Sequence, residues 1–185
     1  MAASCFVLSM KLIVSPAYSE PMAVGPILGY SKQYLSKNLH GTCSSEIQND
    51  LRFGVDATTA DYVACFNTNI AEKPGYAFQP KIELEKAFET APNNEVTFYD
   101  SVTTKELFKA PSGRGHESFL AESRELGYLS FTDAEVNWSN VRLLTDGTVV
   151  STDGTYLGRA APSLSGNHYA INLSTISGSP KETWL

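Results

Sequence analysis

The sequence predicts a mainly β fold of the α+β class, with antiparallel strands, small flanking helices and an irregular N-terminal extension. Three features support this prediction. Short apolar segments separated by turn residues fill the last third of the chain, only two later segments have a clear helical periodicity, and prolines interrupt the first part. Strands do not alternate with long helices, so a parallel sheet is not expected.

Residues 1–60 are expected to form an extension or arm, and residues 61–185 a folded domain. Residues 2–14 are mostly apolar, but Lys11 interrupts them, and they fall short of the roughly 20 apolar residues of a membrane-spanning helix. We expect an apolar arm that packs against another surface, with the remnant of a targeting sequence as the alternative. Ser45 and Gln48 have capping-box spacing, which predicts a short helix through Leu51 with Gly54 as its stop signal.

Two helices and a hairpin are expected in the middle of the chain. Leu84 and Phe88 lie four positions apart, as on one face of a helix, and Gly127 supplies a stop for the second helix. The predicted helices are residues 82–91 and 117–126, and the predicted hairpin strands are residues 96–100 and 106–109.

The last third is expected to be antiparallel β. The pair Asp146 and Gly147 is a strong two-residue hairpin signal, which joins predicted strands at residues 136–144 and 149–151. A final strand at residues 168–176 follows a polar turn at residues 165–167.

Composition limits the classes of function. The chain of 185 residues is 42% hydrophobic and 18% charged, which is typical of a globular protein rather than a disordered one. Its net charge is −6 and no basic stripe is present, so nucleic-acid binding is not expected. Cys5, Cys43 and Cys65 contain no C-x-x-C pair, which leaves three free thiols, or one disulfide and one thiol, as the alternatives.

Three motifs in the second half of the chain resemble a known family. They are GYLSF at residues 127–131, GTYLGR at residues 154–159 and HYAINLSTISG at residues 168–178. Their order and spacing are similar to those of the type-B methionine-R-sulfoxide reductases, whose corresponding segments are GWPSF, G-x-HLGH and RYCINSASL. The ELF segment before them is similar to the PLF strand of that family. The resemblance covers residues 96–178 and implies an antiparallel, β-tent-like fold.

The resemblance also implies that the catalytic groups of such a reductase have been lost. The family attacks the sulfoxide sulfur with a thiolate, and its cysteine corresponds to Ala170, which carries no nucleophile. The two family histidines that hold the sulfoxide oxygen correspond to Tyr156 and Arg159, and the tryptophan that packs on the substrate methyl group corresponds to Tyr128. Several losses together indicate evolutionary decay or repurposing, rather than a single inactivating mutation.

A remnant pocket is expected where these positions meet. The family arginine corresponds to His168, and Asn172 keeps its family identity. The pocket either still binds a methionine-like side chain or a short peptide, or it is filled by tyrosine and leucine side chains while Arg159 points outward. We expect His168 to be a surface or hydrogen-bonding residue, because the sequence shows no acidic or nucleophilic partner beside it. The expected pocket residues are Tyr128, Phe131, Tyr156, Arg159, His168, Ala170 and Asn172.

Metal and cofactor binding are not expected. Many family members staple the fold with zinc held by two C-x-x-C pairs, which would fall near Asp100 and Thr103 and near Val150 and Asp153. None of these residues is a cysteine, so the structural zinc is predicted to be absent.

The favoured hypothesis is a catalytically inactive accessory subunit, a pseudoenzyme that docks through its N-terminal arm onto the protein subunits of a larger complex. The high aromatic content, with Trp184 as one anchor, is consistent with an interface. The alternatives are a non-catalytic binding module for methionine sulfoxide or a peptide, and an active reductase or other oxidoreductase with a relocated thiol such as Cys65. The residues do not identify the compartment. Similar zinc-less sequences occur in microalgae, so the resemblance suggests an organellar, chloroplast- or thylakoid-associated location beside a photosynthetic membrane complex.

Overall fold

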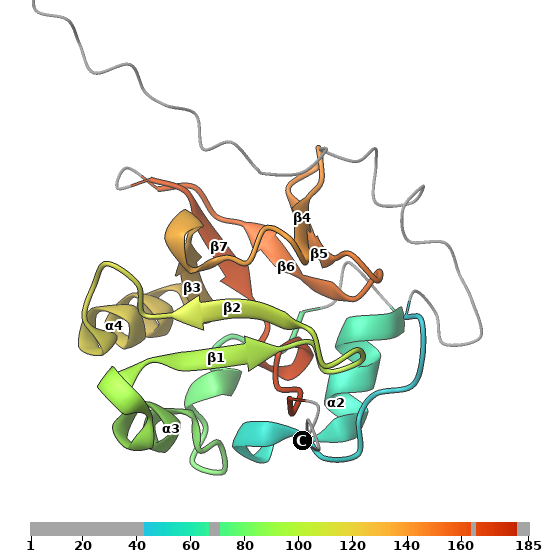
Figure 1. The fold of residues 1–185 in the computed structure, drawn as a ribbon, viewed down its shortest axis with the longest axis horizontal. Helices are drawn as coiled ribbons and strands as arrows, with labels where there is room; N and C mark the ends of the chain where they lie inside the picture. Colours follow the sequence, from blue (N-terminus) through green and yellow to red (C-terminus); the bar gives the residue numbers. More distant parts are fainter. Residues whose placement is uncertain (1–42, 67–70, 164–165, 181–185) are drawn as a thin grey trace, which may run out of the picture.

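The structure is a computed structural model that describes residues 43–66, 71–163 and 166–180 (Figure 1). The apolar arm expected at residues 2–14, Cys5 and the aromatic anchor Trp184 lie outside these described residues. Within them, no helix is long and apolar enough to cross a membrane.

The described residues contain two antiparallel sheets, which agrees with the predicted β-rich α+β class (Figure 1). The smaller sheet is a hairpin of β1 (Val96–Tyr99) and β2 (Glu106–Ala110). The larger sheet has the strand order β3-β7-β6-β5-β4, and all its neighbours are antiparallel. Its strands are β3 (Leu129–Thr132), β4 (Val141–Leu143), β5 (Thr148–Ser151), β6 (Tyr156–Ala160) and β7 (His168–Ile171).

The helices are short and flank these sheets, as predicted (Figure 1). Gly127 has a φ of 80°, a left-handed conformation that ends the longest helix as its sequence position indicates. The α-helices are α2 (Ala57–Asp61), α3 (Leu84–Thr90) and α4 (His116–Leu126). Single turns of 3₁₀ or π helix occur at Arg52–Gly54, Tyr62–Phe66, Tyr76–Phe78, Pro92–Asn94, Asp133–Glu135 and Leu173–Thr175.

The helix predicted from the Ser45 capping box is wrong. Residues 45–51 are irregular, and the first helical turn begins only at Arg52. The Gln48 side chain instead donates to the Asp100 carbonyl oxygen at 2.8 Å and accepts from the Ser179 backbone N–H at 3.1 Å. Long-range contacts to two distant segments therefore replace the local cap.

The core is built around an aromatic cluster between the two sheets. The Phe131 ring, from the larger sheet, stacks on Phe108 of the hairpin with 4.3 Å between ring centroids. Phe98 and Phe119 each meet the same ring at 5.3 Å. Phe53, on the N-terminal side of the expected boundary at residue 60, belongs to this same core. Such offset and edge-on ring contacts each add to the stabilisation from buried area, so the two sheets are held face to face.

Candidate functional site

Five of the seven expected pocket residues line one cleft. Its volume is about 180 Å³, and Ala71 and Gly158 complete its lining. The fold thus brings together expected residues that are up to 44 positions apart in the sequence. The five expected residues in this cleft, which we call the sheet cleft, are Tyr128, Tyr156, Arg159, Ala170 and Asn172.

The pairing of β6 with β7 determines the centre of the sheet cleft. Arg159 and Ala170 are directly opposite partners in this pairing. Cross-strand partners place their side chains on the same face of a sheet, about 5 Å apart at Cβ. Gly158 permits the close approach, because a Cβ at that position would lie only 2.1 Å from the Ala170 carbonyl oxygen.

A buried glutamate holds one wall of the sheet cleft in place. The Glu72 carboxylate, on a residue that is 3% exposed, accepts hydrogen bonds from the backbone N–H groups of Leu173 and Ser174, each at 2.9 Å. The Glu72 backbone N–H donates to Asn172 Oδ1 at 3.1 Å, and its carbonyl oxygen accepts from the Tyr128 hydroxyl at 3.2 Å. Burial raises the pKa of Glu72 to about 7, although the backbone hydrogen bonds oppose the increase.

Asn172 has a structural role in this wall. Its Nδ2 donates to the Leu157 carbonyl oxygen at 2.9 Å, while its Oδ1 accepts from Glu72. Both ends of the amide are therefore used to tie β6 to the segment that contains Glu72. The remaining polar groups at the cleft are the Tyr128 and Tyr156 phenols and the Arg159 guanidinium.

The sheet cleft is lined by hydrogen-bond donors and by small apolar residues. Burial raises the pKa of the Tyr156 phenol, and the nearby Arg159 guanidinium partly offsets this increase. The phenol is therefore protonated at neutral pH and can donate, as can the exposed Arg159 side chain. Ala71, Gly158 and Ala170 add small apolar surfaces.

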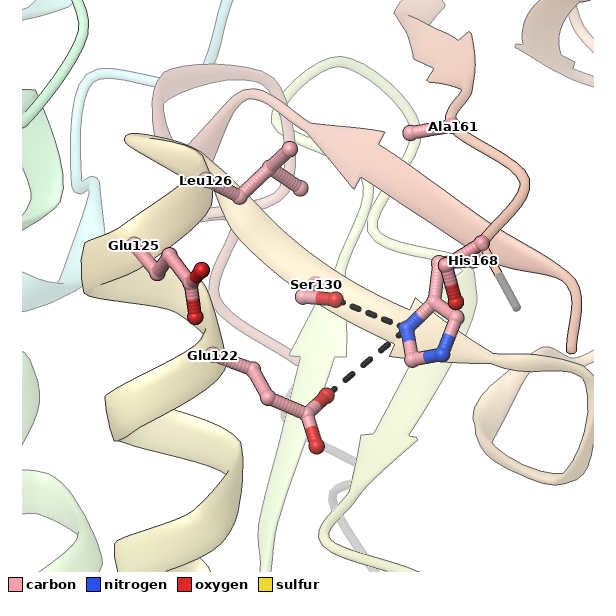
Figure 2. Close-up of a pocket in the computed structure, with 7 residues that line it drawn as sticks. Glu122, Glu125, Leu126, Ser130, Ala161 and His168 are labelled. Atoms are coloured by element: carbon pink, nitrogen blue, oxygen red, sulfur yellow. Dashed lines mark hydrogen bonds and ion pairs between the residues drawn. The ribbon is translucent and has the colours of Figure 1, made fainter. Parts of the chain in front are cut away.

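The structure does not bring Phe131 or His168 to the sheet cleft. Phe131 points to the opposite face of its strand and lies fully buried in the core. His168 lines a second pocket of about 440 Å³, which no sequence motif indicates (Figure 2). The other lining residues are Glu122, Glu125, Leu126, Ser130, Ala161 and Ser163.

His168 is a hydrogen-bonding residue, as expected, but it has a nucleophilic and an acidic neighbour that the sequence did not show. Its Nδ1 atom lies 3.0 Å from Ser130 Oγ and 3.7 Å from a Glu122 carboxylate oxygen (Figure 2). These partners come from β3 and α4, and only the tertiary fold places them beside β7. A Ser-His-acid relay requires the serine and the acid on opposite ring nitrogens. Here both meet Nδ1, so this arrangement orients the imidazole rather than activating the serine.

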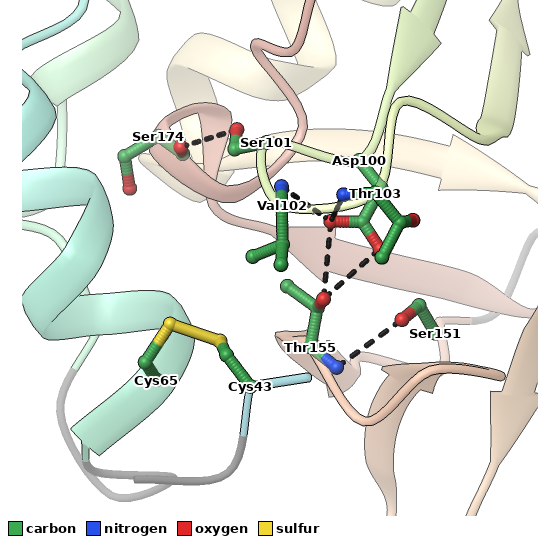
Figure 3. The surroundings of a disulfide bond; sticks show 9 residues. All are labelled: Cys43, Cys65, Asp100, Ser101, Val102, Thr103, Ser151, Thr155 and Ser174. Carbon is green, nitrogen blue, oxygen red and sulfur yellow. Dashed lines mark hydrogen bonds between the residues drawn. A yellow bond between two sulfur atoms is a disulfide. The ribbon is translucent and has the colours of Figure 1, made fainter. Parts of the chain in front are cut away.

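The two segments expected at the zinc position of the family lie side by side, joined by hydrogen bonds (Figure 3). The Thr155 hydroxyl donates to the Asp100 carboxylate, 2.9 Å from Oδ2, and the Val102 backbone N–H donates to Oδ1 at 2.8 Å. Lys105 and Asp153 form an ion pair at 2.8 Å across the same segments. No group of three or more His, Cys, Asp or Glu side chains that could hold a metal ion occurs in the described part of the chain.

A disulfide links Cys43 to Cys65 beside this network (Figure 3). Both cysteines are fully buried and pack with Ala64 and Val102. The expectation of three free thiols is therefore wrong for these two residues, and the disulfide alternative is correct. Cys65 is not available as a relocated thiol while this bond is intact.

Comparisons with known proteins give no further assignment. No family model, no curated protein and no solved structure matches the chain. The geometry of the site therefore carries the functional argument.

Proposed function

We propose that this chain is a non-catalytic accessory domain, similar to type-B methionine-sulfoxide reductases, that holds a side chain of a partner protein in the sheet cleft. One observation carries the proposal. Residues that the resemblance assigns to a substrate pocket converge on one cleft, and its centre holds Ala170, which has no nucleophile. A reductase-like fold with a β-tent arrangement would account for this convergence.

The size of the sheet cleft favours a single side chain as its ligand. Pockets for drug-sized ligands have volumes of about 300–1,000 Å³, whereas this cleft has about 180 Å³. Its donors, the Tyr156 phenol and Arg159, suit a ligand with an acceptor oxygen, and its small apolar surfaces suit an adjacent methyl or methylene group. A methionine sulfoxide side chain combines both features in a short peptide.

The chemistry of the surroundings supports binding rather than turnover. The described cysteines form a disulfide, and the Ser130 hydroxyl is held against the same imidazole nitrogen that meets Glu122. The cleft has groups that orient and hold an oxygen, but its central position has none that attacks. Recognition of a partner segment uses these groups without requiring a reaction.

Titration of capped peptides into the protein, followed by calorimetry, tests the proposal. We expect saturable binding of a peptide that contains methionine-R-sulfoxide and weaker binding of its unoxidised form. The Arg159→Ala variant should bind the oxidised peptide about tenfold or more weakly, as expected when a charged hydrogen bond is lost. Arg124→Ala removes an arginine whose partner, Glu85, lies on the surface, and it should bind like the wild type.

Three results would contradict the proposal. An absence of binding at millimolar peptide would remove the recognition function, as would equal effects of the two arginine variants. Thiol-dependent reduction of the oxidised peptide by the purified wild-type protein would show that the domain is an enzyme.

A further inference from the structure

The pocket beside His168 is larger than the sheet cleft and differs from it in charge. Glu122 and Glu125 project into it from α4, while Ala161 and His168 come from the opposite side. We call it the acidic pocket. The Glu122 carboxylate is ion-paired with Arg114, whereas Glu125 has no ion-pair partner among the described residues.

The acidic pocket and the sheet cleft lie next to one another on the same face of the sheet. His168 and Ala170 are two positions apart on β7, and alternate residues of a strand face the same side. Ser130, which lines the acidic pocket, is the direct cross-strand partner of Ala170, which lines the sheet cleft. Along β7 the two sites are therefore separated by about 7 Å, the rise of two strand residues.

The two sites have complementary charges. Arg159 gives the sheet cleft a positive group, and Glu125 leaves a negative group in the acidic pocket. Leu126 is exposed at the acidic pocket and offers an apolar surface to an aliphatic stem. Lysine and arginine side chains combine such a stem with a cationic head.

From this arrangement we propose that the acidic pocket binds a lysine or arginine side chain of the same partner segment that occupies the sheet cleft. This inference rests on the proposed function. An extended peptide also directs alternate side chains to one face, so the basic residue lies two or four positions from the residue in the cleft. The partner segment is thus an extended peptide with an oxygen-bearing side chain and a nearby basic residue.

Peptides that differ at single positions test this assignment. The oxidised-methionine peptide is prepared with lysine, alanine or glutamate two and four positions before and after the sulfoxide. We expect lysine in at least one of these positions to tighten binding roughly two- to fivefold relative to alanine, the size of an exposed ion pair. Glutamate at that position should weaken binding, and added salt should reduce the lysine effect.

Variants on α4 distinguish an effect of Glu125 in the acidic pocket from an effect of the overall negative charge of the helix. Glu125→Gln should abolish the advantage of lysine and leave the affinity for the alanine peptide unchanged. Glu117→Gln makes the same change on an exposed residue of α4 that does not line the pocket, and it should retain the advantage.

The outcomes separate the two proposals. If the alanine peptide binds but lysine gives no advantage, or if Glu125→Gln keeps that advantage, the assignment of the acidic pocket is wrong and the proposed function stands. If no peptide binds, both fail. Concentration-dependent self-association that Glu125→Gln abolishes would assign the pocket to a second copy of the chain and overturn the peptide assignment.

Discussion

The Glu72 carboxylate accepts a hydrogen bond from the Leu173 backbone N–H at 2.9 Å, across 101 positions of the sequence. This contact fixes the wall of the sheet cleft to the helical turn that follows β7. This helical turn begins at Leu173, just after β7 ends at Ile171. The strand that was predicted to continue to residue 176 is therefore shorter than expected. One buried carboxylate therefore links the turn after the strand to the wall of the sheet cleft.

Glu72 should make stability depend on pH. Burial raises its pKa from 4.5 to about 7 in the folded protein. The folded state therefore holds the proton more tightly than the unfolded state, so the stability that protonation confers is complete below pH 4.5 and is lost as the pH rises through about 7. Each pKa unit corresponds to about 1.4 kcal/mol, so the loss is about 3 kcal/mol. Urea unfolding at about pH 5 and about pH 8 measures it.

The Glu72→Gln variant should lose most of this pH dependence, because glutamine does not titrate. Glu106→Gln removes an exposed carboxylate on β2 and should keep the wild-type dependence. If the stability of the Glu72→Gln variant changes with pH as that of the wild type does, the buried carboxyl group is not its source.

The hydrogen bonds that the buried Asp100 carboxylate accepts should contribute strongly to the stability of the domain. Asp100→Ala leaves the Thr155 hydroxyl and the Val102 N–H buried without their acceptor, which should cost about 3 kcal/mol. Thr155→Val should cost about 1 kcal/mol, and the double variant should cost less than the sum because the two residues share one interaction. Thermal and urea unfolding measure these differences.

Asp153→Ala is the matched control for Asp100→Ala. Asp153 lies in the turn that also carries Thr155, but its ion pair with Lys105 is partly exposed. Its loss should cost less than about 1 kcal/mol. Equal effects of the two substitutions would show that the buried network does not hold the two segments together.

Local sequence signals predicted much of this fold. The apolar spacing of Leu84 and Phe88 and the stop at Gly127 located two helices, and the Asp146–Gly147 pair located a hairpin. These signals depend on residues that are close in the sequence, so they can be recognised without knowledge of the tertiary structure. The resemblance to the reductases similarly grouped Arg159 with Ala170, and both residues line one cleft.

Features that depend on distant partners could not be predicted in this way. Gln48 has a capping-box position, but its amide is taken by Asp100 and Ser179. His168 gains Ser130 and Glu122 as neighbours only when β3 and α4 pack beside β7. The acidic pocket was missed for the same reason, because no short motif links α4 to the end of β6.

The disulfide between Cys43 and Cys65 should stabilise the domain by about 3 kcal/mol, from the entropy lost by the unfolded chain when a loop of 22 residues is closed. The Cys43→Ala/Cys65→Ala double variant should therefore unfold at a lower temperature. A dithiol reductant should lower the unfolding temperature of the wild type and leave that of the double variant unchanged. A reductant effect of the same size on both proteins would contradict the assignment.

A thiol placed at the centre of the sheet cleft should be unusually acidic. Arg159 is the cross-strand partner of Ala170, and a nearby guanidinium stabilises a thiolate. In the Ala170→Cys variant we expect the thiol pKa to fall about one unit below its ordinary value of about 8.5. The pH dependence of alkylation by iodoacetamide, in a Cys5→Ser background, reports this pKa.

Arg159→Ala, combined with Ala170→Cys, should return the alkylation profile to that of an ordinary thiol. Arg142→Ala is the comparison, because Arg142 faces the Trp138 carbonyl oxygen and does not line the cleft. If Arg159→Ala leaves the pH dependence of alkylation unchanged, the guanidinium does not lie close to the thiol at the centre of the cleft.

Gly158→Ala tests the strand register on which both proposed sites depend. The added Cβ would lie 2.1 Å from the Ala170 carbonyl oxygen and 2.9 Å from the Ile171 Cα. Both are backbone atoms of the adjacent strand, which cannot move aside without breaking the pairing, so we expect a loss of about 3 kcal/mol or more and loss of peptide binding. Gly115→Ala, where nothing lies within 4 Å of the added Cβ, should change stability by less than about 1 kcal/mol. Equal unfolding temperatures for the two variants would show that β6 does not pair with β7 in this register, and the convergence of Arg159 with Ala170 would be lost with it.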